Sequence, residues 1–259
     1  MAELVELTHE AHGDLKVNTQ AAIAVAKNTH ILSLRVSEVS RAACELPVFL
    51  TRTDAEANWV ISAITSLEVE KNLMVRDDQW QGIFQPTSMM TYPFFLMRHA
   101  TEENKFTIGI DPEHSAFSKD DGEPLFEDEK KAGPRLSRIT QILQEDMRND
   151  LHTFQFTKHL DEIGLIKPID VSVNYQAGKV NTLKGLNTID EAKLAELSEE
   201  QFKELREKNY LAPIYSLLIS LYQLNNLIRF HNQYSDGEKI AQISMGAEKD
   251  ENAAAQTPS

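Results

Sequence analysis

The chain has 259 residues, with 26 lysines and arginines against 40 aspartates and glutamates, and its formal net charge is −14. Such an acidic surface repels phosphates, which argues against nucleic acid or an anionic membrane as the partner. The single cysteine excludes an internal disulfide and a cysteine-rich metal site. The N-terminus has neither a basic nor an apolar segment, so we expect no secretory signal and a cytoplasmic location, with leaderless export left open.

The first 110 residues are expected to be mainly β. Residues 21–26 fit either a strand or a short helix, and a short helix over residues 39–46 should end at Pro47, which lacks the backbone N–H. Alternating or short apolar runs predict strands at residues 47–50, 59–67, 93–97 and 106–110, and a hairpin from residues 73–75 and 80–84. Their short connections favour antiparallel pairing.

Residues 111–134 are polar and rich in turn signals. Eight acidic residues and three lysines fall between positions 111 and 131, and Asp121-Gly122 and Gly133-Pro134 are typical of turns. This segment is therefore expected to be a long surface loop or a boundary between a β region and a helical region.

Residues 135–235 change to a helical period. We expect two helices over residues 136–163, broken near residues 152–157, then a hairpin over residues 170–186. Capping boxes at residues 188–191 and 198–201 should open two short helices, and Pro213 should begin the last one.

The last helix has an unusually wide apolar face. Ile214, Leu217 and Leu221 form its main stripe, whereas Tyr215 and Tyr222 fall on another face, so we expect burial on more than one side. Its apolar run of about a dozen residues is too short for a membrane span, which needs ~20. Residues 236–259 lose periodicity and are expected to be a disordered tail. These elements predict an α+β fold, and a single integrated domain over residues 1–235 is compatible with them.

The sequence contains none of the common catalytic fingerprints. It has no glycine-rich phosphate loop, no G-x-S-x-G and no H-E-x-x-H motif. Cys44 is expected to be a small buried hydrophobic residue. His12 and Asp14 have the spacing of two ligands of a non-heme iron site, with a distal histidine unassigned, but a short match of this kind more often marks a turn.

Five polar or amphipathic residues at predicted strand and helix edges are the candidates for a ligand pocket. They are His30, Glu38, Trp80, Tyr92 and Asp111. The favoured alternative is that they satisfy one another structurally, because buried polar groups usually pair internally. The residues leave the identity of any cofactor unknown.

An ordered set of short motifs resembles the bacterial SapC-like family, which is distinct from the similarly named peptide-transporter permease. The resemblance extends over about residues 7–230. Its residues include Thr29-His30-Ile31-Leu32-Ser33-Leu34, Pro47-Val48-Phe49, Asn72-Leu73-Met74-Val75, Tyr92-Pro93-Phe94, Leu183-Lys184-Gly185-Leu186, Ile189-Asp190-Glu191, Ile214-Tyr215 and Ser220-Leu221. Where the family often has a basic pair before Tyr-Pro-Phe, this chain has Met89-Met90-Thr91.

The resemblance implies which proteins are encoded nearby, but it does not imply a chemical reaction. Members are often found beside outer-membrane TonB-dependent receptors, tryptophan-halogenase-like proteins and oxygenase-like proteins, and no catalytic residues carry over. We therefore expect a non-catalytic accessory protein that binds a protein or a small ligand, and a homo-oligomer is compatible with this. The alternatives are a metal-dependent, non-heme iron oxygenase-like enzyme, in which His12 and Asp14 would be ligands, and a surface-layer component.

Overall fold

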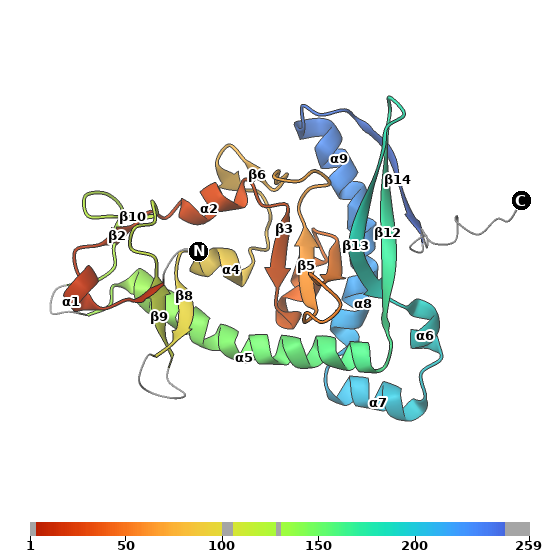
Figure 1. Ribbon diagram of the computed structural model, residues 1–259, viewed down its shortest axis with the longest axis horizontal. Helices are drawn as coiled ribbons and strands as arrows, with labels where there is room; N and C mark the ends of the chain where they lie inside the picture. Colours follow the sequence, from red (N-terminus) through yellow and green to blue (C-terminus); the bar gives the residue numbers. More distant parts are fainter. Residues whose placement is uncertain (1–3, 100–105, 128–130, 247–259) are drawn as a thin grey trace, which may run out of the picture.

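The computed structural model describes residues 4–99, 106–127 and 131–246 of the chain. It is an elongated α+β molecule in which helix α5 (Pro134–Glu162) runs along much of the long axis (Figure 1). Small sheets surround the N-terminal end of α5, and a larger sheet lies towards its other end. The α+β expectation is confirmed.

The larger sheet has six antiparallel strands in the order β14-β12-β13-β4-β5-β3. Its strands are β3 (Ile31–Leu34), β4 (Val48–Thr51), β5 (Val60–Ile64), β12 (Ile166–Tyr175), β13 (Val180–Ile189) and β14 (Ile240–Gly246). The expected second hairpin is present as β12 and β13, which extend beyond the predicted bounds. Asn187 of β13 pairs with Leu50 of β4, so strands from both halves of the chain share one sheet.

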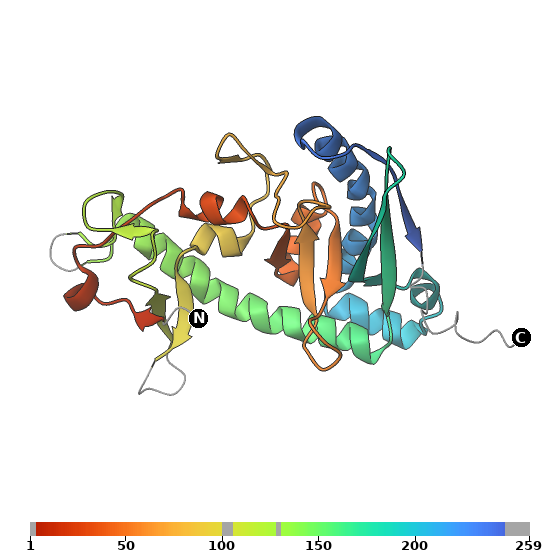
Figure 2. The ribbon, with the colours of Figure 1, turned by 45° about the horizontal axis from the view of Figure 1, so that its top comes forward.

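Helices from both halves cover this sheet (Figure 2). They are η1 (Val36–Glu38), α3 (Val39–Ala42), α6 (Glu191–Ala195), α7 (Glu199–Glu207), α8 (Leu211–Ser220), η3 (Leu221–Gln223) and α9 (Leu224–Tyr234). Val48, Phe156, Ile214 and Leu217 are fully buried in one core cluster between sheet and helices. A second cluster lies where Leu227 of α9 packs near β12 and β14.

The remainder of the molecule is built from short elements. Its strands and helices are β1 (Val5–Glu6), α1 (His9–His12), β2 (Lys16–Val17), α2 (Ala21–Ala26), β6 (Val75–Arg76), β7 (Gln79–Trp80), α4 (Thr87–Thr91), β8 (Phe95–Arg98), β9 (Phe106–Ile110), β10 (Phe117–Ser118) and β11 (Glu123–Pro124). The polar segment 111–134 contributes β10 and β11, which flank β2. Its Phe117 and Leu125 are buried against Leu136 of α5, so part of this segment belongs to a core.

The predicted break near residues 152–157 is wrong, because α5 is one continuous helix of 29 residues. Two threonines lie at the expected break. Thr153 Oγ1 donates to the Asn149 carbonyl at 2.6 Å and accepts from Val36 N at 2.9 Å. Thr157 Oγ1 donates to the Phe154 carbonyl at 3.2 Å. Their hydroxyls are thus satisfied inside the fold, which removes the competition that usually makes such residues end helices.

Three further expectations are corrected. The tail is not wholly disordered, because Ile240–Gly246 forms β14 on the edge of β12; residues 247–259 lie outside the described part. Cys44 is exposed rather than buried, and its Sγ donates to the Ser40 carbonyl at 3.4 Å. Asp190, and not Thr188, caps α6, while the predicted capping box at Ser198 and Gln201 is present.

One stretch of the described chain, Leu211–Tyr234, is long and apolar enough to cross a membrane by length and composition alone. A core helix of a soluble protein passes the same test, and Ile214, Leu217 and Leu227 of this stretch are fully buried within the fold. The absence of a membrane span therefore stays a prediction.

Candidate functional site

The five residues predicted to form a pocket do not gather around one cavity. Glu38 is buried and accepts hydrogen bonds from Arg35 N, Thr87 N and Thr87 Oγ1, each at 2.8 Å. Trp80 Nε1 donates to the Phe84 carbonyl at 2.8 Å. These bonds hold neighbouring segments together, and neither side chain lines the α6–α8 groove or the α2–α5 cavity described below.

Tyr92 and Asp111 are brought near each other. The Tyr92 hydroxyl lies 2.8 Å from His114 Nε2, and Asp111 Oδ1 accepts from Glu113 N at 3.2 Å. Partial burial raises the pKa of Tyr92, and the negative charge of Asp111 raises this pKa further. His30 lies elsewhere, where its Nδ1 accepts from Glu70 N at 3.4 Å. None of these three residues lines the α6–α8 groove or the α2–α5 cavity described below.

His12 and Asp14 take part in separate local contacts. His12 Nδ1 accepts from Thr8 N at 3.1 Å, and Asp14 forms an ion pair with Lys119 at 2.6 Å. The Lys119 ammonium lowers the pKa of the Asp14 carboxyl. No group of three or more His, Cys, Asp or Glu side chains within the described ranges is placed to hold a metal ion. The iron-site hypothesis therefore gains no geometric support from these residues.

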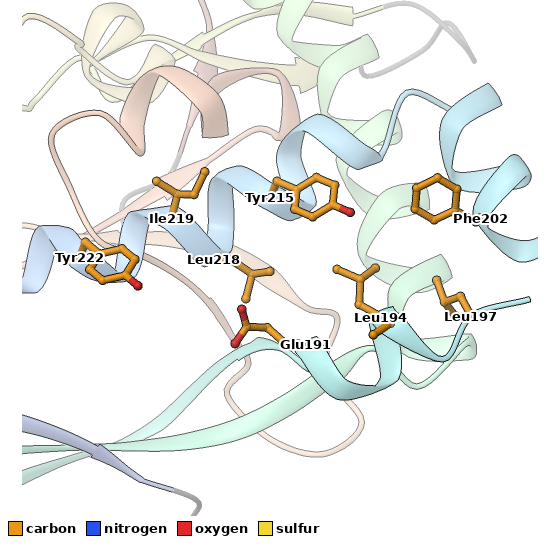
Figure 3. Close-up of a pocket in the computed structure, with 9 residues that line it drawn as sticks. Glu191, Leu194, Leu197, Phe202, Tyr215, Leu218, Ile219 and Tyr222 are labelled. Atoms are coloured by element: carbon orange, nitrogen blue, oxygen red, sulfur yellow. The ribbon is translucent and has the colours of Figure 1, made fainter.

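An open, largely apolar groove lies between α6 and α7 on one side and α8 on the other, and we call it the α6–α8 groove (Figure 3). Its volume is about 510 Å³. It is lined by Glu191, Leu194, Ala195, Leu197, Phe202, Tyr215, Leu218, Ile219 and Tyr222. The first five come from α6, α7 and their connection, and the last four from α8 and η3.

Local sequence sets the two walls. The Asp190 side chain accepts from Ala192 N and Lys193 N and so starts α6, and the Ser198–Gln201 capping box starts α7. The inner faces of α7 and α8 are anchored by Leu205, Ile214 and Leu217, all fully buried. Residues on the outer face of α8 are consequently left to form the groove.

These outer residues are exposed, which corrects the expectation that the wide apolar face is buried on both sides. Ile219 is 61% exposed and Tyr222 is 76% exposed, and Tyr215 and Phe202 are also exposed. The sequence indicated the apolar face of α8 but missed the facing wall of Leu194, Leu197 and Phe202. That wall arises only when α6 and α7 fold beside α8.

Glu191 is the one residue with a charged side chain at neutral pH among those that line the groove. It lies on the α6 wall beside Leu194 and Leu218 (Figure 3). Within the described part of the chain, no side chain or backbone group pairs with its carboxylate. The groove therefore combines a large apolar and aromatic surface with a single unpaired negative charge.

A cluster of polar side chains, away from the groove, joins α9 to the segment that follows β5. His231 is fully buried, with Nε2 2.9 Å from the Glu238 carbonyl and Nδ1 3.8 Å from Glu68 Oε2. Glu68 also pairs with Lys71 at 2.6 Å and accepts from Ser235 Oγ at 3.3 Å. Burial alone would raise the pKa of Glu68, but Lys71, His231 and Ser235 together lower it. The cluster closes the turn that leads into β14.

Comparison with known proteins decides the family. The SapC family model matches residues 7–227, which is most of the chain. The chain belongs to the SapC family. No curated protein and no solved structure matches it. For this SapC-family protein, the residues that would perform a function must therefore be argued from its own geometry, and the α6–α8 groove lies within the matched region.

Proposed function

We propose that this SapC-family protein is a non-catalytic accessory protein that binds an amphipathic helix of a partner protein in the α6–α8 groove. The observation that carries the proposal is the exposure of Ile219 and Tyr222 beside an apolar wall. Exposed apolar patches with polar surroundings are typical of interaction sites. Aromatic residues contribute most at such interfaces because they bury a large area with little conformational freedom to lose.

The shape of the groove favours a helix over a compact ligand. Tyr215, Leu218, Ile219 and Tyr222 have the spacing i, i+3, i+4, i+7, so they form a stripe about 10 Å long over α8 and η3, at about 1.5 Å per residue. The facing wall of Leu194, Leu197 and Phe202 completes an open trough. Helix-in-groove recognition uses apolar anchors with the same spacing on the bound helix.

Charge specifies the partner further. An unpaired carboxylate beside apolar side chains is best satisfied by a cation, so we expect a lysine or arginine of the partner helix to face Glu191. Proteins of TonB-dependent uptake and the modification enzymes implied by the family's surroundings are the candidate partners to screen for a helix of this kind.

The test uses two synthetic helical peptides of leucine with either lysine or glutamate, labelled for fluorescence anisotropy in 0.15 M salt. We expect the lysine peptide to bind and the glutamate peptide to bind at least about tenfold more weakly, because like charges meet at Glu191. Tyr222→Ser and Glu191→Gln should each weaken the lysine peptide by about three- to thirtyfold.

Glu56→Gln is the matched control, because Glu56 is an exposed glutamate outside the groove and the substitution makes the same change in net charge. If Glu56→Gln and Glu191→Gln weakened peptide binding equally, the peptide would be responding only to the net negative charge of the protein. Unchanged binding to Tyr222→Ser would contradict the groove as the site.

A further inference from the structure

A second cavity, of about 460 Å³, lies between α2, α4 and the first turns of α5, and the proposed function does not use it. Its apolar wall is formed by Ala22 and Ile23 of α2, Met89 and Met90 of α4, and Ile139 and Ile142 of α5. A volume of this size is within the range of small-molecule sites, which are mostly apolar with a few polar groups. We call it the α2–α5 cavity.

Two arginines line the same cavity. Arg135 and Arg138 are three residues apart on α5, so they share a face of the helix with Ile139 and Ile142. No residue in the described ranges forms a hydrogen bond or ion pair with the Arg138 guanidinium, which is exposed. The positive end of the α5 dipole adds to the charge of the two side chains.

Arg135 is incompletely satisfied. Its Nη1 lies 3.4 Å from Glu123 Oε2, and its Nε–H is shielded from solvent without a hydrogen-bond partner among the described residues. A guanidinium has five N–H donors, so most of its capacity is unused here. Glu123 also lines the cavity, and together with the two arginines it leaves a net charge of +1 at the wall.

We propose that the α2–α5 cavity binds an apolar small molecule that carries one carboxylate. The guanidinium groups match the planar geometry of a carboxylate. The net charge of the wall balances a single negative charge. The methionine, isoleucine and alanine side chains bury the apolar part of the ligand, and methionine adapts to irregular shapes.

Decanoate and decanol are the probes, because they share an apolar chain and differ in charge. Isothermal titration calorimetry of the full chain should show decanoate binding at least about tenfold more tightly than decanol. Arg138→Gln should weaken decanoate by about tenfold and leave decanol unchanged. Ala22→Leu, which fills the cavity, should weaken both probes.

Arg148→Gln is the matched control, because Arg148 is exposed on the same helix but does not line the cavity. Equal effects of Arg148→Gln and Arg138→Gln, or equal affinity for decanoate and decanol, would overturn the proposal, as would inorganic phosphate that displaces decanoate at a similar concentration. Tyr222→Ser should leave decanoate binding intact. The decanoate experiment therefore tests the α2–α5 cavity separately from the peptide experiment, which tests the α6–α8 groove.

Discussion

Glu68 illustrates how single residues support the fold away from the groove. Its carboxylate contacts Lys71 and Ser235 and faces the buried His231, so one side chain links the segment after β5 to the end of α9. Gly237 lies so close to Glu68 that an added Cβ would come 2.9 Å from Glu68 Oε1. A larger residue at this position would displace the Glu68 carboxylate, and the same turn places β14 beside β12.

The lowered pKa of Glu68 has a consequence for stability against pH. A carboxyl group whose pKa is lowered on folding stabilises the protein above its unfolded pKa, and this contribution is lost as the pH falls through the folded value. We expect Glu68→Gln to lower the melting temperature at pH 7. The difference from the wild type should shrink below the ordinary glutamate pKa of 4.5, as the wild-type carboxyl becomes protonated.

Melting curves followed by circular dichroism between pH 3 and pH 7 test this expectation. Glu56→Gln, at an exposed position, is the control and should change the curves little. A Glu68→Gln penalty that stays constant over the whole pH range would show that its packing, and not its charge, matters.

At the scale of elements, the position of α5 depends on one arginine. Arg35 follows β3, and its guanidinium binds Asp146 of α5 through two bonds, Nε to Oδ1 at 2.8 Å and Nη2 to Oδ2 at 2.7 Å. Its Nη1 lies 2.5 Å from Asp150. Val36 N and Thr153 add a third link between the same segments. The middle of α5 is thus fixed to the edge of the large sheet.

Asp146→Asn should lower the free energy of unfolding by about 1.5–3 kcal/mol, because a charge-assisted, two-bond contact is weakened at a site where Asp146 is largely shielded from solvent. Urea denaturation measures the change. Asp161→Asn, at an exposed position of α5 outside this contact, should cost much less. Equal costs for the two variants would mean that Arg35 does not anchor the helix.

At the scale of the whole molecule, α5 belongs to two cores. Leu136, Ile139 and Leu143 pack with the small sheets, and Phe156 and Leu160 pack with the large sheet. The helix is about 44 Å long at 1.5 Å per residue, so it connects the two ends, which also meet where Thr87 of α4 bonds to Glu38 of η1. The same helix borders the α2–α5 cavity, whereas the α6–α8 groove lies at the other end.

This arrangement predicts that the two ends unfold together in the wild type. Met147 lies between the two core segments of α5 and is exposed, so Met147→Pro should break the helix without removing a core side chain. We expect a loss of about 3 kcal/mol and separate melting transitions for the two ends in scanning calorimetry. Met147→Ala should keep a single transition. Two transitions in the wild type would contradict coupling through α5.

The sequence by itself determined the local elements of this protein. A short apolar run placed β4, alternation placed β5, and the Ser198 capping box placed the start of α7. The apolar run after Pro213 placed α8, which begins two residues earlier than predicted, at Leu211. These signals are local, because they depend on residues within one or two turns. The same pattern revealed Tyr215, Ile219 and Tyr222 as a separate apolar face, and the ordered motifs indicated the SapC family.

Tertiary structure decided what those elements meet. Ile240–Gly246 is a strand because β12 offers an unpaired edge, and α5 continues through Thr153 because Val36 and Asn149 satisfy its hydroxyl. Val36 lies 117 residues from Thr153, and β12 is likewise distant from β14 in sequence, so no local pattern could predict these two partners. The five predicted pocket residues lie at different places because local patterns do not show which elements become neighbours. The groove forms only where α6 and α7 face α8. Contacts between distant residues gain free energy only after the chain has folded, and the site is made of such contacts.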